Sequence, residues 1–317
     1  MNFQVIADQF WPLLLQGSAL GLTYSLIALG YTMVYGVLRL INFANSEIFM
    51  LGTFATMMIE MNVFHRQLGT PSLHGLQLVL VLVVTLIGSS LACAVLAMLV
   101  ELVAYRRLRA RGTNRLASLI SAIGTSIFLA ETVRLFTQSR SRSAPRVLDK
   151  WSFGEFHGAN LRIDTVLTIV ATITIFIVLD RFVTKSHLGK AIRAVSMSEE
   201  NSKLMGINLN RVITYTFAIG GLTTGAAAFF YTTTYENTVF NVGFSLGIAA
   251  FTAAVLGGIG NLRGAFFGGW SLGLLEQFAS ALLGSQWKSV TVFLVLVLVL
   301  LIKPSGIFGE AVQQTRT

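Results

Sequence analysis

The sequence predicts an all-α, polytopic membrane protein with about eight to nine transmembrane segments, one or two of them short or discontinuous. Hydrophobic residues make up 54% of the chain and charged residues only 12%, whereas about a quarter of the residues in a soluble domain are charged. Most apolar runs are roughly 18 to 25 residues long, which suits membrane-spanning helices and not the shorter alternating strands of a β-barrel. We expect a single transmembrane domain over residues 1–317.

Residues 11–35 form the first predicted span, because 25 residues extend roughly 37 Å as a helix, enough to cross a bilayer with tilt. Its interior polar residues Thr23, Tyr24 and Ser25 are expected to face other helices or a cavity. No Lys or Arg precedes Arg39, so the basic start of a cleavable signal is missing. We therefore expect the N-terminus on the outer side of the membrane.

Residues 46–61 form a short apolar segment. As a helix these sixteen residues reach about 24 Å, less than the hydrocarbon thickness of a bilayer. Asn42, Asn45 and Ser46 are candidates to cap the new helix. A short helix that starts at polar residues is typical of a discontinuous helix near the midplane. An ordinary short span with a tight loop is the alternative, so whether this segment crosses fully stays open.

The next two predicted spans, residues 76–100 and 116–136, enclose a basic connection. Its part over residues 105–115 contains no acidic residue and five arginines, namely Arg106, Arg107, Arg109, Arg111 and Arg115. Such clusters mark the cytoplasmic side of a membrane protein. Near the outer end of the second span, Glu131 and Arg134 lie three residues apart on one helical face and are expected to form an ion pair.

Residues 137–164 form a long polar loop that this topology places on the outer side. The loop carries five Lys and Arg residues, against the usual bias toward the cytoplasmic side. Over the whole chain, however, the topology leaves 15 Lys and Arg residues at the inner side and 8 at the outer side. We therefore expect the loop over residues 137–164, like the N-terminus, on the outer side.

Residues 184–211 form the most continuously polar run of their length in the chain, and a polar segment of this length must lie outside the hydrocarbon. Its lysines and arginines indicate the cytoplasmic side. We expect two short helices, over residues 191–195 and 199–205, with Ser198 as the N-cap of the second and Gly206 at its end. The loop is either simply solvated or a docking element for a cytoplasmic partner.

The remaining spans bring the predicted total to nine, with the C-terminus inside. They cover residues 165–183, 212–233, 244–259 and 264–283, and a last span ends at Lys303. Residues 244–259 are again short, and whether they cross fully also stays open. Gly220, Gly221 and Gly225 allow close packing of one helix, and Gly264, Gly268, Gly269 and Gly273 give another helix two small-residue faces.

No motif for catalysis, a metal or a nucleotide stands out. The glycine-rich stretch at residues 257–264 lacks the spacing of a dinucleotide fingerprint, and Gly189-Lys190 lacks the first glycine of a phosphate loop. The single cysteine, Cys93, and four scattered histidines do not suggest a metal site. The net charge of +9 fits a bias in membrane orientation and not nucleic-acid binding. We expect no cofactor and no catalytic residues.

Three motifs in order resemble a known family. They are G-Y-T-M-V-Y-G-V-L-R-L-I-N-F-A-N-S-E at residues 30–47, L-G-K-A-I-R-A-V through M-G-I-N-L-N-R-V at residues 188–212, and A-A-F-T-A-A-V-L-G-G-I-G-N-L-R-G-A-F-F-G-G at residues 249–269. In these motifs the chain resembles the Liv-type permeases of bacterial ABC importers for branched-chain amino acids, in the superfamily that also contains the ribose permeases. Two positions depart from the family pattern: Ser46 stands where glycine is usual, and Asn45 where histidine is common.

The resemblance implies a multi-pass protein of the bacterial inner membrane that moves branched-chain amino acids into the cytoplasm. Such a permease pairs with a second, homologous permease chain, identical or different, and with two cytoplasmic ATPase subunits. A periplasmic substrate-binding protein delivers the ligand, and the chain itself is not an enzyme. The resemblance further implies that the segment around residues 199–206 couples to an ATPase, with the candidate residues Glu199, Glu200, Asn201, Leu204 and Gly206.

The polar start of the short segment is the candidate translocation path, since free backbone groups and amide side chains inside a bilayer need a polar cavity. The residues assigned to it are Asn42, Phe43, Asn45, Ser46 and Glu47. The same machinery could import urea, short amides or another amino acid. An intramembrane enzyme or an ion channel is a further alternative, but the chain shows neither a catalytic cluster nor repeated filter loops. Glu276, alone inside a span, is either a packing residue or a functional one.

Overall fold

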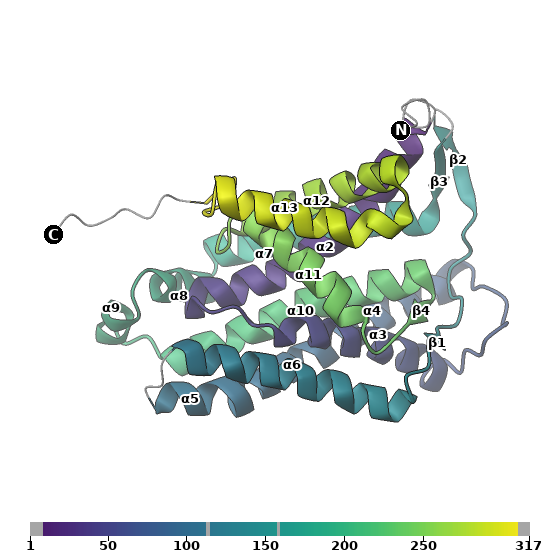
Figure 1. The fold of residues 1–317 in the computed structure, drawn as a ribbon. Helices are drawn as coiled ribbons and strands as arrows, with labels where there is room; N and C mark the ends of the chain where they lie inside the picture. The colour runs from purple at the N-terminus through teal and green to yellow at the C-terminus, as the bar shows by residue number, and fades with distance from the viewer. Residues whose placement is uncertain (1–8, 112–114, 157–158, 310–317) are drawn as a thin grey trace.

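The computed structural model describes residues 9–111, 115–156 and 159–309, which form a bundle of helices with two short strand pairs at one end (Figure 1). Among these residues nine helices have 15 or more residues: α2 (Phe10–Leu38), α3 (Ala44–Asn62), α4 (Gly75–Val100), α6 (Arg115–Thr137), α7 (Ile163–Lys185), α10 (Leu209–Tyr235), α11 (Val242–Gly257), α12 (Leu262–Leu283) and α13 (Lys288–Ile302). Each falls on one of the nine predicted segments.

Six helical stretches are long and apolar enough to cross a bilayer: Phe10–Leu38, Gly75–Arg109, Leu116–Thr137, Ile163–Lys185, Leu209–Tyr235 and Ser285–Ile302. Helix α11 is apolar but shorter. Together these helices confirm the prediction of a polytopic, all-α membrane protein. That all nine segments cross remains a prediction.

The loops divide between two opposite ends of the bundle (Figure 1). One end carries three short helices, α5 (Arg106–Ala110), α8 (His187–Met197) and α9 (Glu199–Leu204). The other end carries two antiparallel strand pairs, β1 (Arg142–Ser143) with β4 (Asn237–Thr238) and β2 (Ser152–Phe156) with β3 (Ala159–Arg162). The basic connection and the loop over residues 184–211 thus share one end, as the sequence predicted, and the loop over residues 137–164 lies at the other.

Ion pairs fix the loop over residues 137–164 to the end of α10. Arg146 Nε lies 3.2 Å and Lys150 Nζ 2.9 Å from the same oxygen of Glu236, and Lys150 also donates to the carbonyl oxygen of Thr234. Partial burial raises the pKa of Glu236, but the hydrogen bonds from Lys150 and Arg146 outweigh it and hold the pKa below the usual value of a glutamate. The predicted ion pair of Glu131 and Arg134 is also present, with 2.6 Å between its atoms.

Helices α2 and α10 form the centre of the bundle, because most of their residues are buried, whereas few residues of α6, α7 and α13 are buried. The exposed residues of these outer helices include large apolar side chains such as Phe128, Val178 and Leu301. Side chains of this kind match the hydrocarbon of a bilayer. The bundle therefore buries its polar helices inside and presents its most apolar helices outside.

The predicted glycine faces are confirmed as sites of close helix packing. A side chain at Gly221 would lie 2.6 Å from the carbonyl oxygen of Cys93 in α4, and real side chains do not approach that closely. In α12, side chains at Gly264 and Gly268 would overlap the backbone of α11, and at Gly269 and Gly273 that of α2. Helix α12 thus packs against two neighbours through two faces made of small residues.

The start of α3 corrects one prediction. The helix begins after Phe43, and no side chain caps it, so the expected capping by Asn42, Asn45 or Ser46 is wrong. The side-chain oxygens of Asn42 and Asn45 instead accept hydrogen bonds from other helices. The helix has 19 residues, which extend about 28 Å and nearly match the hydrocarbon thickness.

The polar loop over residues 184–211 contains the two predicted short helices, but the first is longer than predicted. Helix α8 spans His187–Met197 and not residues 191–195, because Ser186 caps it earlier by accepting a hydrogen bond from the Gly189 N–H. Ser198 caps α9 as predicted and accepts from the Asn201 N–H. Gly206 follows with a φ of +80°, the left-handed conformation that favours glycine at the end of a helix.

We predict that Gly273→Val lowers the thermal stability of the protein, because the new side chain would collide with α2 at Gly21. Overpacking of this kind costs about 1–3 kcal/mol. The measurement is the melting temperature of the purified protein in detergent. Gly124→Val in α6 is the matched control, since nothing lies within 4 Å of a side chain at Gly124. Equal melting temperatures for the two variants would contradict the close α2–α12 contact.

Candidate functional site

Polar side chains from the start of α3 are buried in the bundle. Asn42, Asn45 and Glu47 are each 2% exposed, Ser46 is also buried, and Phe43 is half-buried. The structure therefore places all five residues that the sequence singled out for the path together, in the interior. Polar residues with this burial in a membrane protein are costly, and they commonly mark the route of a substrate or ion.

Each of these polar side chains contacts a different helix. The Tyr105 hydroxyl, at the end of α4, donates to Asn42 Oδ1 over 2.9 Å. The Thr224 hydroxyl of α10 donates to Asn45 Oδ1 over 3.2 Å. The Ser126 hydroxyl of α6 donates to Glu47 Oε1 over 3.3 Å. The start of α3 is thus a junction where four helices meet through polar contacts.

Several buried polar atoms at this junction have no protein partner. They are Asn42 Nδ2, Asn45 Nδ2, Glu47 Oε2 and the neighbouring Thr32 Oγ1 of α2. Buried polar atoms in folded proteins almost always have a hydrogen-bond partner, so a group of orphans in one place calls for water or a ligand. The junction therefore contains two amide donors and a carboxylate oxygen that have no protein partner.

The second short helix, α11, forms the opposite wall of the junction. Side chains at Gly243 and Gly247 would overlap Ser46, so only glycine lets α11 approach α3 this closely. One turn further along α11, the ring of Phe251 lies 6.2 Å from the ring of Phe43 and 6.4 Å from that of Tyr31. The junction thus combines unpaired polar atoms with an aromatic wall.

Sequence reasoning found α3 and α11 as separate short segments and missed that they meet. It also missed Tyr31, Tyr105 and Phe251, which lie far from residues 42–47 in the sequence. The only feature of the sequence that suggested a relation between α3 and α11 was that both segments are short.

A second polar cluster joins the basic helix α5 to α10. A π-helical turn, Glu101–Tyr105, continues α4 directly into α5. The carboxylate of Glu101 is fully buried and pairs with Arg106 Nη2 at 2.8 Å and with Arg109 Nη2 at 3.0 Å. It also accepts a hydrogen bond from Thr214 of α10. This cluster, which sequence reasoning did not identify, holds the basic helix in a defined position.

The loop of α8 and α9 presents an apolar surface to solvent. Leu204 is 85% exposed, and Met197 and Met205 are nearly as exposed. The other residues predicted for coupling, Glu199, Glu200, Asn201 and Gly206, are exposed as well. Exposed apolar residues clustered on a polar loop commonly mark a protein interface.

This loop is connected to the start of α3 through Arg39. The residue follows directly after α2, in a left-handed conformation with a φ of +51°. Its Nη2 donates to the carbonyl oxygens of Ser196 and Met197 at the end of α8, over 3.1 and 3.5 Å. Arg39 therefore lies between the exposed loop and the polar junction that begins at Asn42.

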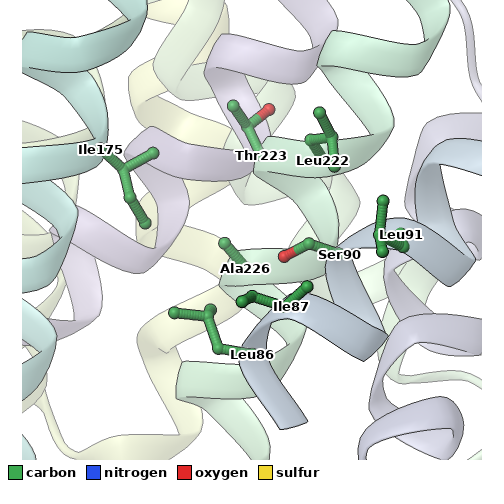
Figure 2. A pocket seen from close by; sticks show the side chains of 8 residues that line it. All are labelled: Leu86, Ile87, Ser90, Leu91, Ile175, Leu222, Thr223 and Ala226. Carbon is green, nitrogen blue, oxygen red and sulfur yellow. The ribbon is translucent and has the colours of Figure 1, made fainter. Parts of the chain in front are cut away.

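A cavity elsewhere in the bundle has a different character. Figure 2 shows side chains of α4, α7 and α10 around a space of about 260 Å³, among them Ile87, Ile175 and Leu222. Its lining is almost wholly apolar, with the hydroxyls of Ser90 and Thr223 as the polar groups. Because it holds no charged residue, it suits hydrocarbon and not the polar part of an amino acid.

The buried carboxyl group of Glu276 in α12 has a partner. The hydroxyl of Tyr24 in α2 donates to Glu276 Oε2 over 2.8 Å, so this residue is hydrogen-bonded within the packed interface of two helices. Within the described ranges, no three His, Cys, Asp or Glu residues are grouped so that they could hold a metal ion.

Comparison with known proteins gives a consistent result. The family described as "Branched-chain amino acid transport system / permease component" matches residues 13–301. The high-affinity branched-chain amino acid transport system permease protein BraD of Pseudomonas aeruginosa is 39% identical over 94% of this chain and 95% of its own length. The LivH permease proteins of Salmonella typhimurium and Escherichia coli are 38% and 37% identical, over 96% of this chain and 98% of their own lengths.

The match extends over the whole bundle, including the polar junction at the start of α3 and the loop of α8 and α9. Identity at this level over nearly the full length of both chains leaves no large segment unaccounted for. The chain is therefore a multi-pass membrane protein and belongs to the family of branched-chain amino acid transport system permease components.

Proposed function

We propose that this chain is the permease subunit of an ABC importer that moves branched-chain amino acids across the inner membrane into the cytoplasm. The observation that carries the proposal is the polar junction at the start of α3. There, unpartnered polar atoms of Asn42, Asn45 and Glu47 belong to the same short segment as Phe43, whose ring lies near that of Phe251. An amino acid with an aliphatic side chain needs this combination of polar donors and acceptors with an apolar wall.

The junction is suited to transient contact and not to tight capture. It offers few charges, and a path must release its ligand after each cycle. High affinity would then reside in a periplasmic binding protein that delivers the amino acid. A second permease chain, homologous to this one, would complete the path. Few residues of α6, α7 and α13 are buried, so these helices leave room for such a partner beside the lipid.

The loop of α8 and α9 would receive the ATPase subunit. This assignment is supported by the exposed apolar side chains of Met197, Leu204 and Met205 on an otherwise polar loop. The left-handed Gly206 gives this loop a defined shape. Two such ATPases, one for each permease chain, would supply the energy, and this chain would hydrolyse no ATP itself.

In the proposed orientation the end of the bundle with α5, α8 and α9 is cytoplasmic. This orientation is supported by the run of arginines in and after α5, in a stretch without acidic residues. The N-terminus and the loop over residues 137–164 would then be periplasmic and the C-terminus cytoplasmic. The loop would also be available to the binding protein.

Import of urea or short amides by the same machinery is the second candidate. The unpartnered amide groups of Asn42 and Asn45 favour it, because an amide donor can serve the carbonyl oxygen of urea as well as a carboxylate. Competition of unlabelled leucine, isoleucine, valine and urea against labelled leucine uptake separates the two. Competition by urea alone would replace the first proposal with the second.

We predict that Asn42→Leu and Asn45→Leu each slow transport by about fivefold or more, because each substitution removes an amide and leaves a buried hydroxyl without its acceptor at a cost of about 1–3 kcal/mol. Initial uptake rates and basal ATP hydrolysis are measured on the reconstituted complex, and the latter should be unchanged. Asn62→Leu, at the exposed far end of the same helix, is the matched control. Normal transport in both buried variants would exclude the junction from the path.

We predict that Leu204→Asp uncouples ATP hydrolysis from transport, since a carboxylate would replace an apolar side chain that the interface buries. Loss of a central interface side chain costs about 2 kcal/mol or more, so uptake should fall by more than tenfold. Gly206→Ile should also lower uptake and uncouple ATP hydrolysis from transport, because a β-branched residue is strained at a φ of +80°. Leu68→Asp, which changes another exposed leucine in a loop at the opposite end of the bundle, should have no effect; full transport by Leu204→Asp would rule out docking here.

We predict that single cysteines at Lys203 and Ser152 react with a membrane-impermeant thiol reagent from opposite sides of the membrane. Both positions are exposed, and they lie in the loops at opposite ends of the bundle (Figure 1). The background is Cys93→Ser, which removes the native buried thiol. In intact cells whose outer membrane is permeable, Ser152→Cys should react and Lys203→Cys should not. The reverse pattern would invert the proposed orientation.

A further inference from the structure

A smaller cavity lies at the end of the bundle that carries α5, α8 and α9. Its volume is about 190 Å³, below the range of about 300–1,000 Å³ that is typical of sites for drug-sized molecules. Its lining comes from α2 and the link that follows it, from the end of α4 and from α5, α6 and α9. The lining residues are Leu38, Arg39, Leu40, Tyr105, Arg109, Ser118 and Glu199.

The cavity contains a guanidinium with an unused donor. Arg109 Nη2 is engaged by Glu101 and by Asn210 Oδ1, but Arg109 Nη1 is buried and has no partner. A buried charged donor without an acceptor is costly. Arg39, the second guanidinium of the lining, uses its Nη2 for the carbonyl oxygens at the end of α8. A carboxylate in the cavity would lie in the field of both cations.

The opposite charge is present in the same cavity. Glu199, the first residue of α9, contributes a carboxylate to the lining. Leu38, Leu40 and the ring of Tyr105 supply apolar surface between the charged groups. A ligand that suits all three features carries a carboxylate, an ammonium group and a short apolar side chain.

We propose that this cavity binds a free zwitterionic amino acid with an aliphatic side chain, on the side of the membrane where the transported molecule is released. The ligand carboxylate pairs with Arg109 and Arg39, its ammonium group pairs with Glu199, and its side chain lies against Leu38 and Leu40. The proposal rests on the proposed function and orientation above, which make the ligand the transported product itself.

A purely anionic ligand fits the lining less well. Inorganic phosphate would pair with the two arginines, but Glu199 would repel its negative charge, whereas an ammonium group turns the same carboxylate into a partner. A monocarboxylate without an amine would leave Glu199 unpaired. The zwitterion is thus the ligand class that uses every charged group of the lining.

Occupancy of this cavity would affect turnover. The lining joins α9, which is part of the proposed ATPase docking loop, to Arg39 and Tyr105, which lead to the polar junction at Asn42. A ligand that bridges these elements stabilises the conformation in which they lie together. Amino acid that accumulates in the cytoplasm would therefore slow further import.

The test uses the whole importer in proteoliposomes, with ATP and unlabelled L-leucine enclosed and the binding protein with labelled L-leucine outside. Enclosed leucine should reduce the initial uptake rate of the wild-type importer. Ser118→Leu places a side chain in the cavity and should remove this inhibition while uptake into leucine-free vesicles stays unchanged. Ala117→Leu adds the same bulk to the neighbouring position of α6, which does not line the cavity, and should remain inhibited.

Binding is measured separately on the purified complex without the binding protein. Labelled L-leucine should bind, and Arg109→Gln should weaken binding by about tenfold or more, the effect of losing a hydrogen bond to a charged group. Isocaproate, isoamylamine and inorganic phosphate, each of which lacks part of the zwitterion, should compete weakly or not at all. Competition by phosphate as strong as by leucine would replace the proposed ligand class with an anion.

The outcomes separate this inference from the proposed function. Uptake of leucine into leucine-free vesicles tests the function alone. If uptake is normal but enclosed leucine neither binds nor inhibits, or if Ser118→Leu stays as inhibited as Ala117→Leu, the inference is wrong and the function stands. If the wild-type importer takes up no leucine, the proposed function fails, and the binding measurement still decides whether the cavity accepts an aliphatic amino acid.

Discussion

The structure depends on one constraint: a polar group inside the hydrocarbon of a bilayer must find its partner within the protein. The two central helices, α2 and α10, satisfy this constraint largely through hydrogen bonds from their polar side chains to their own backbone. In α10, the hydroxyls of Thr216 and Thr232 donate to backbone carbonyl oxygens one turn earlier, and Ser25 of α2 donates both to its own helix and to α12. Because these side chains are satisfied without water, helices rich in polar residues occupy the interior. The most apolar helices are left to face lipid.

The same constraint distinguishes a packing residue from a functional one. Glu276 is buried in a helix interface, yet the Tyr24 hydroxyl pairs with it, and the structure needs nothing further there. At the start of α3, by contrast, three side chains keep an unpartnered atom although Tyr105, Thr224 and Ser126 donate to them. Burial is similar in the two places, so the unsatisfied hydrogen-bonding capacity is what distinguishes the junction from Glu276.

Local patterns in the sequence were sufficient to predict the helices but not the contacts between side chains of different helices. Run lengths located all nine long helices, and the spacing of Gly264, Gly268, Gly269 and Gly273 correctly indicated two packing faces, because both features lie within one helix. The contact of Thr214 with Glu101 spans 113 residues, and that of Tyr105 with Asn42 spans 63. Nothing in either local sequence specifies such a pair. The capping prediction at α3 failed for this reason: the amide oxygens were already used by distant helices.

The connection through Arg39 explains how two distant surfaces can share one mechanism. Arg39 holds the end of α8 by two carbonyl oxygens, and three residues later Asn42 is held by Tyr105. The link between α2 and α3 is therefore fixed at both ends, with the exposed loop on one side and the polar junction on the other. A displacement of α8 that keeps the Arg39 hydrogen bonds would act on residues 39–43, since α2 itself is packed against α12 through Gly21, Gly269 and Gly273. A short, doubly anchored link beside a rigid helix transmits motion because it has little freedom to absorb it.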